Sequence, residues 1–182
     1  MKVEPIFKST EQALHVSFLV TSLPATQKTV MQAIYEANVG RSGVAGTVNT
    51  RGLTQLEFRG QCAMVCAAVD SHLGMPPERH AIKAFLGHQL VKAEGVRGIA
   101  EYLEPVLDFG GMALLATAWN VFANGEQRKG LTEREICKHY NLSQSKIHRA
   151  AEKIRKTSSE LRLRGSSGLD GYFKETGLVM AE

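Results

Sequence analysis

The chain has 182 residues, of which 43% are hydrophobic and 22% are charged, and this balance excludes a protein that is disordered throughout. Its first residues, MKVEPIFKSTEQ, lack the basic start and apolar run of a signal peptide. The longest apolar stretch, residues 111–123, is too short to cross a bilayer. We therefore expect a cytoplasmic protein with no membrane contact.

The formal net charge of +4 is unevenly distributed along the chain. Residues 128–164 hold eleven Lys and Arg against four Glu, a balance of +7, so the remainder of the chain carries −3. A basic segment on a slightly acidic body is typical of a protein that meets a polyanion, because neutralised phosphates release condensed counterions. A solvated basic helix face is the other interpretation that the charge allows.

The N-terminal region predicts two helices. In the first, Ser9 and Gln12 have capping-box spacing, and the apolar run that follows ends at Pro24, although HVSFLV within it also fits a strand. The second helix is predicted within residues 24–38, with Pro24 before its start.

Residues 40–52, GRSGVAGTVNTRG, contain four glycines. They lack the Gly-Lys-Ser/Thr ending of a phosphate-binding loop, so we expect a flexible connection. Arg41 and Arg51 within it are candidate contacts to a nucleic-acid backbone. Residues 1–52 are therefore interpreted as an N-terminal helical segment followed by a glycine-rich linker.

Long helical patterning resumes at residue 53, in LTQLEFRGQCAMVCAAVDSHLG, and is expected to end at Gly74. The residues predicted to face inward are Leu56, Cys62, Ala63, Cys66 and Val69.

The three cysteines, Cys62, Cys66 and Cys137, are an odd number without the spacing of a disulfide framework, which suits a reducing compartment. Cys62 and Cys66 could be imagined as zinc ligands together with His72 or His80. Their small apolar neighbours favour a place in the core instead. We expect no metal and no cofactor.

Three further helices complete the body of the protein. PPERHAIKAFLGHQ begins with proline, GVRGIAEYLEPVL is expected to kink or stop near Pro105, and GMALLATAWNVFANG is apolar around most of its circumference, as in a helix buried among others. The inward residues predicted for the first two are Ile82, Phe85, Leu86, Ile99, Tyr102 and Leu103. No region is rich in strand signals, so the fold class is all-α.

The stretch LTEREICKHYNLSQSKIHRAAEKIRK, residues 131–156, has helical periodicity with one break, at residues 141–143. On the twenty-residue register of a helix-turn-helix that starts at Thr132, seven positions have the required size or polarity: Ile136, Cys137, Tyr140, Asn141, Leu142, Ile147 and Ala150. Asn141 stands where the backbone is left-handed, a conformation that Asn tolerates. Thr132 and Glu135 have capping-box spacing, and Ser143 is a natural N-cap.

This register predicts which side chains face DNA. Candidates to contact base edges are Gln144, Ser145, His148 and Arg149. Candidates to contact phosphates are Arg128, Lys129, Lys138, Lys146, Lys153, Arg155 and Lys156. A plain helical hairpin is the alternative. RNA recognition is disfavoured, because His139 and Tyr140 are the ring-bearing candidates for stacking and Tyr140 is assigned inward.

The second half of the chain resembles the helical DNA-binding region 4 of sigma factors, through PPERHAIKAFLGH as an upstream helix and LTEREICKHYNLSQSKIHRAAEKIRK as the helix-turn-helix. More loosely, residues 63–66, the ERHAIKAF helix and the terminal helix-turn-helix are similar, in that order, to small phage late-gene antiterminators and related phage regulators. The resemblance implies a protein that binds promoter-proximal DNA and contacts RNA polymerase. The chain differs from both in the residues 88–127 that separate its two resembling pieces.

Together these patterns predict an all-α helical bundle with a core at residues 53–125, a C-terminal helix-turn-helix DNA-binding region at 126–164 and a flexible tail at 165–182. The predicted function is a sequence-specific transcription regulator of phage or prophage type, which docks residues 143–156 in the major groove of double-stranded DNA. A DNA-binding assembly component, such as a small packaging subunit, is the alternative. A homodimer would suit a pair of half-sites. We expect no enzyme, because the chain has no HExxH, no paired acid motif and no nucleophile elbow.

Overall fold

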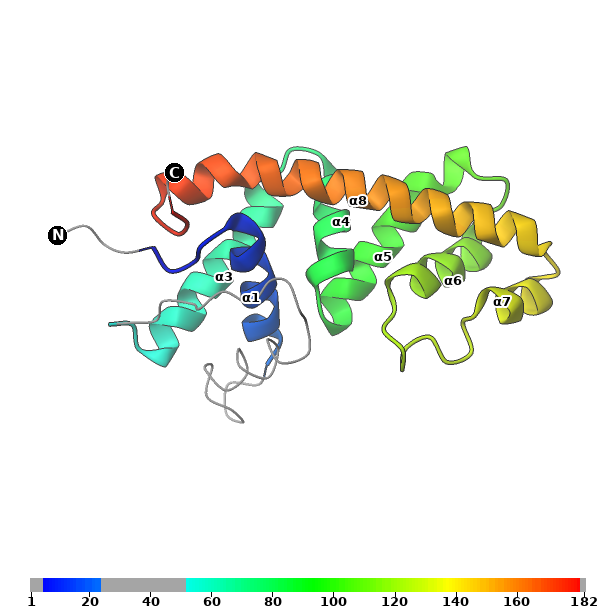
Figure 1. Cartoon of the computed structure of the whole chain (residues 1–182), viewed down its shortest axis with the longest axis horizontal. Helices are drawn as coiled ribbons and strands as arrows, with labels where there is room; N and C mark the ends of the chain where they lie inside the picture. The colour runs from blue at the N-terminus through cyan, green and yellow to red at the C-terminus, as the bar shows by residue number, and fades with distance from the viewer. Residues whose placement is uncertain (1–4, 24–51, 181–182) are drawn as a thin grey trace. The chain divides into compact units, whose positions relative to one another are not determined.

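A computed structural model describes residues 5–23 and 52–180, and every regular element named within them is a helix (Figure 1). The only β pairing among these residues is an isolated bridge between Phe7 and Val179. The all-α prediction is confirmed for this part of the chain. The helix predicted at 24–38, and Arg41 and Arg51 in the glycine-rich segment, lie outside the described residues.

The described residues divide into two compact units. The first contains the chain up to Gly74 and from Gly165 onward, and the second is Met75–Arg164. This division differs from the predicted segments at 53–125 and 126–164. The boundary near residue 165 falls inside a single long helix, α8 (Gln144–Glu175).

In the first unit, α1 (Thr10–Ser22) packs against α3 (Gln55–His72). The start of α1 is capped by Ser9, whose hydroxyl accepts a hydrogen bond from the backbone N–H of Gln12 at 3.2 Å, so the ambiguous HVSFLV stretch is helical. The ring of Phe58 in α3 also lies 6.1 Å, centroid to centroid, from the ring of Phe7, which precedes α1. Local capping and apolar burial together therefore define this helix pair.

The inward face predicted for α3 is wrong in part. Leu56 is 80% exposed and Ala63 is also exposed, whereas the buried stripe is Phe58, Cys62, Val65, Ala68 and Val69. Apolar and small residues surround much of this helix, so periodicity alone left its rotation ambiguous. The contact with α1 decides it, because the bulky Phe58 ring needs a partner surface.

The C-terminal residues differ from the predicted flexible tail. Residues 165–175 continue α8, in which Leu169 and Phe173 are fully buried, and Leu178 and Val179 beyond it are buried as well. The backbone N–H of Phe7 donates to the carbonyl of Leu178 at 3.0 Å. The glycines and serines at 165–168 suggested flexibility. The apolar side chains of Leu169 and Phe173, four residues apart, share one helix face, and the burial of that face keeps the segment helical.

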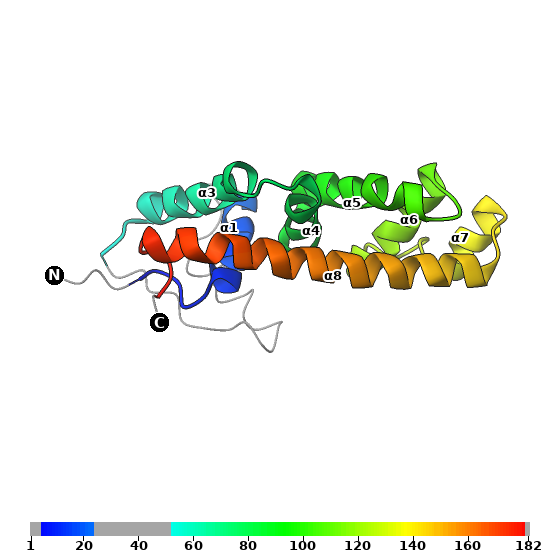
Figure 2. The ribbon, with the colours of Figure 1, turned by 90° about the horizontal axis from the view of Figure 1, so that it is seen from above.

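The second unit contains α4 (Pro76–Leu86), α5 (Gln89–Leu103), the short η1 (Glu104–Val106), α6 (Gly111–Phe122), α7 (Glu133–Tyr140) and the first part of α8. Its core joins buried side chains of α4, α5 and α6 to Ile154 and Leu161 of α8, which run beside them (Figure 2). Of the described helices, none is long and apolar enough to span a bilayer.

The packing of α4 against α5 depends on two glycines. A Cβ atom at Gly95 would lie 2.3 Å from the backbone nitrogen of Ala84, and one at Gly98 would meet the ring of His80 at 2.3 Å. Helices approach this closely only where one of them has no side chain. Tyr102, which was predicted to face inward, is 46% exposed instead, because the α5 face that turns toward α4 is centred on these glycines.

Candidate functional site

The loop before α7 is tied to the end of α6. The side chain of Asn120 donates to the carbonyl of Leu131 at 2.6 Å, and its own backbone carbonyl accepts a hydrogen bond from Nε of Arg128 at 3.0 Å. These two bonds hold the ten residues after α6 close to it, and α6 and α7 are in contact. The position of α7 is therefore set by the body of the second unit.

The start of α7 has the predicted capping box. The hydroxyl of Thr132 accepts from the backbone N–H of Glu135, and the carboxylate of Glu135 accepts from the backbone N–H of Thr132 at 2.9 Å. The Thr132 hydroxyl and backbone N–H, which both donate to this carboxylate, lower the pKa of Glu135 below its ordinary value. Glu135 is thus occupied by the cap and is ionised at neutral pH.

The turn after α7 follows the expected backbone path. Asn141 has φ 51° and ψ 44°, the left-handed conformation predicted for it. The N–H of Asn141 and that of Leu142 both donate to the carbonyl of Cys137, the latter at 3.1 Å. Ser143 then caps α8, since its hydroxyl accepts from the N–H of Lys146 at 3.4 Å. Three residues therefore separate the two helices.

The inward positions of this helix pair are filled as the register requires. Ile136, Ile147 and Ala150 are between 0% and 2% exposed. Cys137, Tyr140 and Leu142 are half-buried around them. The buried side chains of α7 and of the start of α8 are therefore part of the second unit.

The four side chains predicted to contact bases are all exposed along the first turns of α8: Gln144, Ser145, His148 and Arg149. Two of them have additional contacts within the protein. Nε of Arg149 donates to the carbonyl of Ser145 at 3.2 Å. The two terminal guanidinium nitrogens take no part in that bond. His148 lies between two carboxylates, with Nδ1 3.3 Å from Glu133 of α7 and Nε2 3.7 Å from Glu152 of α8.

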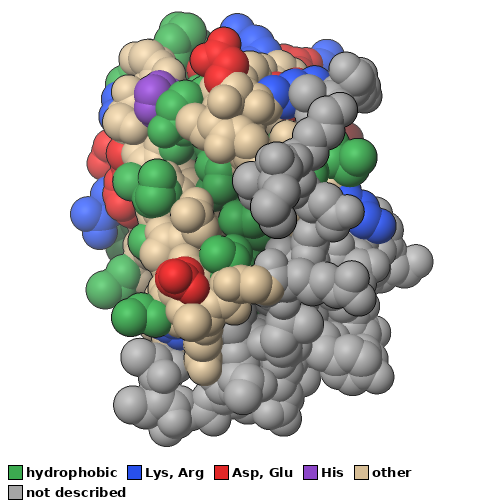
Figure 3. Space-filling view, turned by 90° about the vertical axis from the view of Figure 1, so that its left-hand side faces the viewer, with side chains coloured by type: hydrophobic (Ala, Val, Ile, Leu, Met, Phe, Trp, Pro, Cys, Tyr) green, Lys and Arg blue, Asp and Glu red, His purple; other side chains and the backbone are tan. Residues whose placement is uncertain are grey.

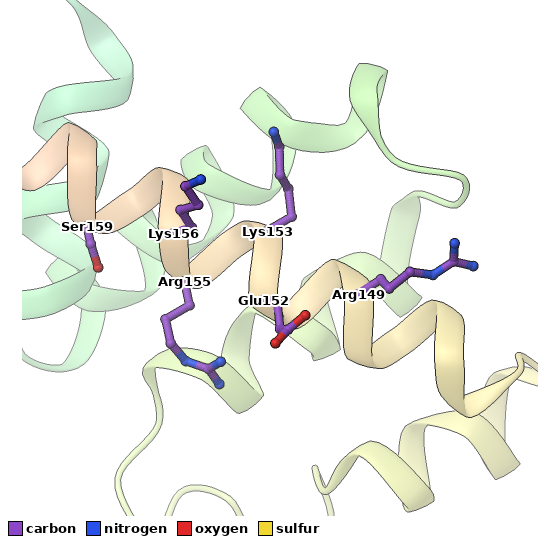
Figure 4. Close-up of a pocket in the computed structure, with 6 residues that line it drawn as sticks. All are labelled: Arg149, Glu152, Lys153, Arg155, Lys156 and Ser159. Carbon is purple, nitrogen blue, oxygen red and sulfur yellow. The ribbon is translucent and has the colours of Figure 1, made fainter.

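A shallow basic hollow follows on α8. It has a volume of about 560 Å³ and is lined by Arg149, Glu152, Lys153, Arg155, Lys156 and Ser159. Lys153 and Lys156 point to the same side of the helix, whereas Arg155 and Glu152 point to the other (Figure 4). Three of the predicted phosphate contacts on α8, Lys153, Arg155 and Lys156, are thus divided between two flanks of the helix, with Arg149 between them and the helix start.

The remaining predicted phosphate contacts fall into two groups. Lys138 is exposed in the last turn of α7 and Lys146 is half-buried in α8. Arg128 bonds the carbonyl of Asn120, and Lys129 makes an ion pair with Glu126 at 2.6 Å. The last two side chains therefore have partners within the protein, which their charge did not reveal.

Sequence reasoning missed Glu133 and Glu152. Both were counted only as charges that reduce the basic balance, yet both face the ring of His148. The signal available was the i,i+4 spacing of His148 and Glu152 on one helix. No sequence signal indicated the contact with Glu133, because it joins two helices.

On the face shown in Figure 3, the side chains of Lys and Arg are interspersed with those of Asp and Glu and do not form one patch. Among the described residues there is no group of three or more His, Cys, Asp or Glu placed to hold a metal ion. Cys62 is fully buried and Cys66 half-buried, in agreement with a core position for Cys62.

No protein-family model matches this chain, and no curated protein matches it either.

Proposed function

We propose that this protein is a sequence-specific DNA-binding transcription regulator of phage or prophage type. In this proposal α7 and the start of α8 form a helix-turn-helix, and residues 143–156 dock in the major groove of double-stranded DNA. The observation that carries the proposal is the left-handed turn at Asn141 between two capped helices, with Ile136 and Ile147 buried on the inside. Outward from the same turn, the exposed side chains are polar or basic.

The distribution of basic side chains supports this mode of binding. A helix that lies in the major groove has a sugar-phosphate strand along each side. Lys153 and Lys156 on one flank of α8 and Arg155 on the other could each reach a strand (Figure 4). Arg149, whose guanidinium extends away from α8 toward the start of the helix, suits the N7 and O6 acceptors of guanine.

The proposed partner is double-stranded DNA, and the sigma-like resemblance adds RNA polymerase as a second candidate partner. A homodimer would read two half-sites about one helical turn apart. We propose no catalytic step and no cofactor for this function, since binding alone accounts for regulation.

The test is a selection of duplexes from a random pool by the purified full chain at two salt concentrations. An enriched motif is the expected result, and its half-site spacing reports the oligomer. Arg149→Ala should relax the preference at one position of the motif, whereas Lys153→Ala should weaken binding to all sequences about equally. If both variants lower specific and nonspecific binding alike, the assignment of the recognition helix fails.

Binding that is lost with salt and enriches no motif would contradict sequence-specific regulation. It would favour the alternative, a DNA-binding assembly component such as a packaging subunit. A large ring in solution, measured by light scattering, would support that alternative.

A further inference from the structure

We propose that His148 recognises an exocyclic amino group, that of adenine or cytosine, in the major groove, and that Glu133 gives the ring the hydrogen-bonding character this needs. The inference rests on the proposed DNA-binding function and adds to it a chemical preference at one base position. Glu133 acts through His148 and is thus a positioning residue.

The contact between α7 and α8 joins Glu133 to His148. Nδ1 of His148 lies 3.4 Å and 3.3 Å from the two carboxylate oxygens of Glu133. The side chain of Glu133 is 27% exposed and that of His148 is 58% exposed. Glu133 is the first residue of α7, directly after the Thr132 cap, so its backbone is held in place by the capping box. The imidazole therefore has one nitrogen beside the Glu133 carboxylate, while more than half of its side chain stays exposed.

The Glu133 carboxylate determines which ring nitrogen of His148 carries the hydrogen. An ionised carboxylate only accepts hydrogen bonds, so the hydrogen of a neutral imidazole facing Glu133 must be on Nδ1. The other nitrogen, Nε2, then carries a lone pair and is an acceptor. The nearest oxygen of Glu152 is 3.7 Å from Nε2, which is longer than a hydrogen bond.

The Nε2 acceptor can pair only with a hydrogen-bond donor on a base edge. In the major groove the hydrogen-bond donors of the bases are N6 of adenine and N4 of cytosine, whereas guanine and thymine present acceptors on their own edges. A ring acceptor at the start of a recognition helix would therefore favour adenine or cytosine on the contacted strand. Asn and Gln can flip between donor and acceptor, but a histidine held at Nδ1 cannot.

Protonation would invert the preference. The charged groups that face the ring are Glu133 from α7 and Glu152 from α8 itself. An imidazolium carries hydrogens on both nitrogens, so Nε2 becomes a donor toward bases that present acceptors, such as guanine.

The experiment combines two readouts on the full chain. The first is the imidazole ¹⁵N spectrum of free protein at pH 8, which distinguishes a hydrogen on Nδ1 from one on Nε2. The second is duplex selection from a random pool with the wild type, His148→Ala, Glu133→Gln and Glu152→Gln at pH 8. Glu133→Gln leaves a side chain that both donates and accepts, so it no longer selects one tautomer. Glu152→Gln is the matched control, because it removes the same charge from the other side of the ring.

We expect the wild type and Glu152→Gln to carry the hydrogen on Nδ1 and to prefer adenine or cytosine about tenfold at one position. His148→Ala and Glu133→Gln should lose that preference and keep the rest of the motif. A motif that is identical in all four proteins, or a hydrogen on Nε2 in the wild type, would overturn this inference and leave the proposed function standing. If no motif is enriched by any protein, both fail.

Discussion

The salt dependence of DNA binding provides the most direct quantitative test of the basic surface. Of the seven side chains predicted to contact phosphate, Arg128 bonds a carbonyl of α6 and Lys129 pairs with Glu126 in the loop before α7, which leaves five. Each phosphate contact to duplex DNA contributes about −0.9 to the slope of log K against log salt concentration, so five contacts predict a slope of about −4.5. The affinity should then fall about 500-fold between 50 and 200 mM salt.

The variants for this test follow from Figure 4. Lys153→Ala should reduce the slope by about 0.9, and the double variant with Lys156→Ala by about 1.8. Arg97→Ala removes the same charge from a separate hollow between α5 and α6 and should leave the slope unchanged. Lys129→Ala should have a smaller effect than Lys153→Ala, because its charge is already paired with Glu126.

The assay is fluorescence anisotropy of a labelled duplex of arbitrary sequence at a series of salt concentrations, with circular dichroism to check that each variant is folded. A wild-type slope shallower than about −2 would show that at most two phosphates are contacted. An unchanged slope in the Lys153 and Lys156 double variant would show that α8 does not face the DNA backbone. Either result would refute the placement of the binding surface.

Three further predictions concern the fold. Gly95→Ala should lower the free energy of unfolding by about 1–3 kcal/mol, because its Cβ would lie 2.3 Å from an α4 backbone nitrogen. Gly60→Ala, with open space around it, should raise that free energy by about 0.5–1 kcal/mol; equal effects in urea unfolding would contradict the close helix contact. Burial raises the pKa of Cys62 to about 11, so at pH 8 a thiol reagent should modify Cys66 and leave Cys62 unmodified until the protein unfolds. Mass spectrometry of the folded protein checks this order, and modification of Cys62 before Cys66 would contradict it. Burial lowers the pKa of His80 from its ordinary 6.5, so the stabilisation that its neutral ring contributes is full above pH 6.5 and declines as the pH falls below it. Thermal unfolding at pH 7.5 and 5 should show this loss in the wild type and less of it in His80→Gln. Equal losses in the two proteins would contradict a lowered pKa of His80.

Some of this structure is already determined by neighbouring residues in the sequence. The Thr132 and Glu135 cap, the left-handed Asn141 and the N-cap at Ser143 each depend on side chains within four positions of one another, so spacing was enough to predict them. The burial of Ile136 and Ile147 could also be predicted, because a register that fits a turn of this length leaves few inward positions.

Tertiary contacts decided the rest. The rotation of α3 depends on its packing against α1, and the continuation of α8 to Glu175 depends on burial of Leu169 and Phe173 among residues far away in the sequence. The contact between Glu133 and His148 joins residues fifteen positions apart on two helices, so charge counting treated them as unrelated. Periodicity identifies which residues share a helix face, but it carries no information about the partner that the face will meet. For that reason the sequence by itself determined the local form of the candidate site, and only the three-dimensional arrangement showed which of its charged side chains are held within the protein.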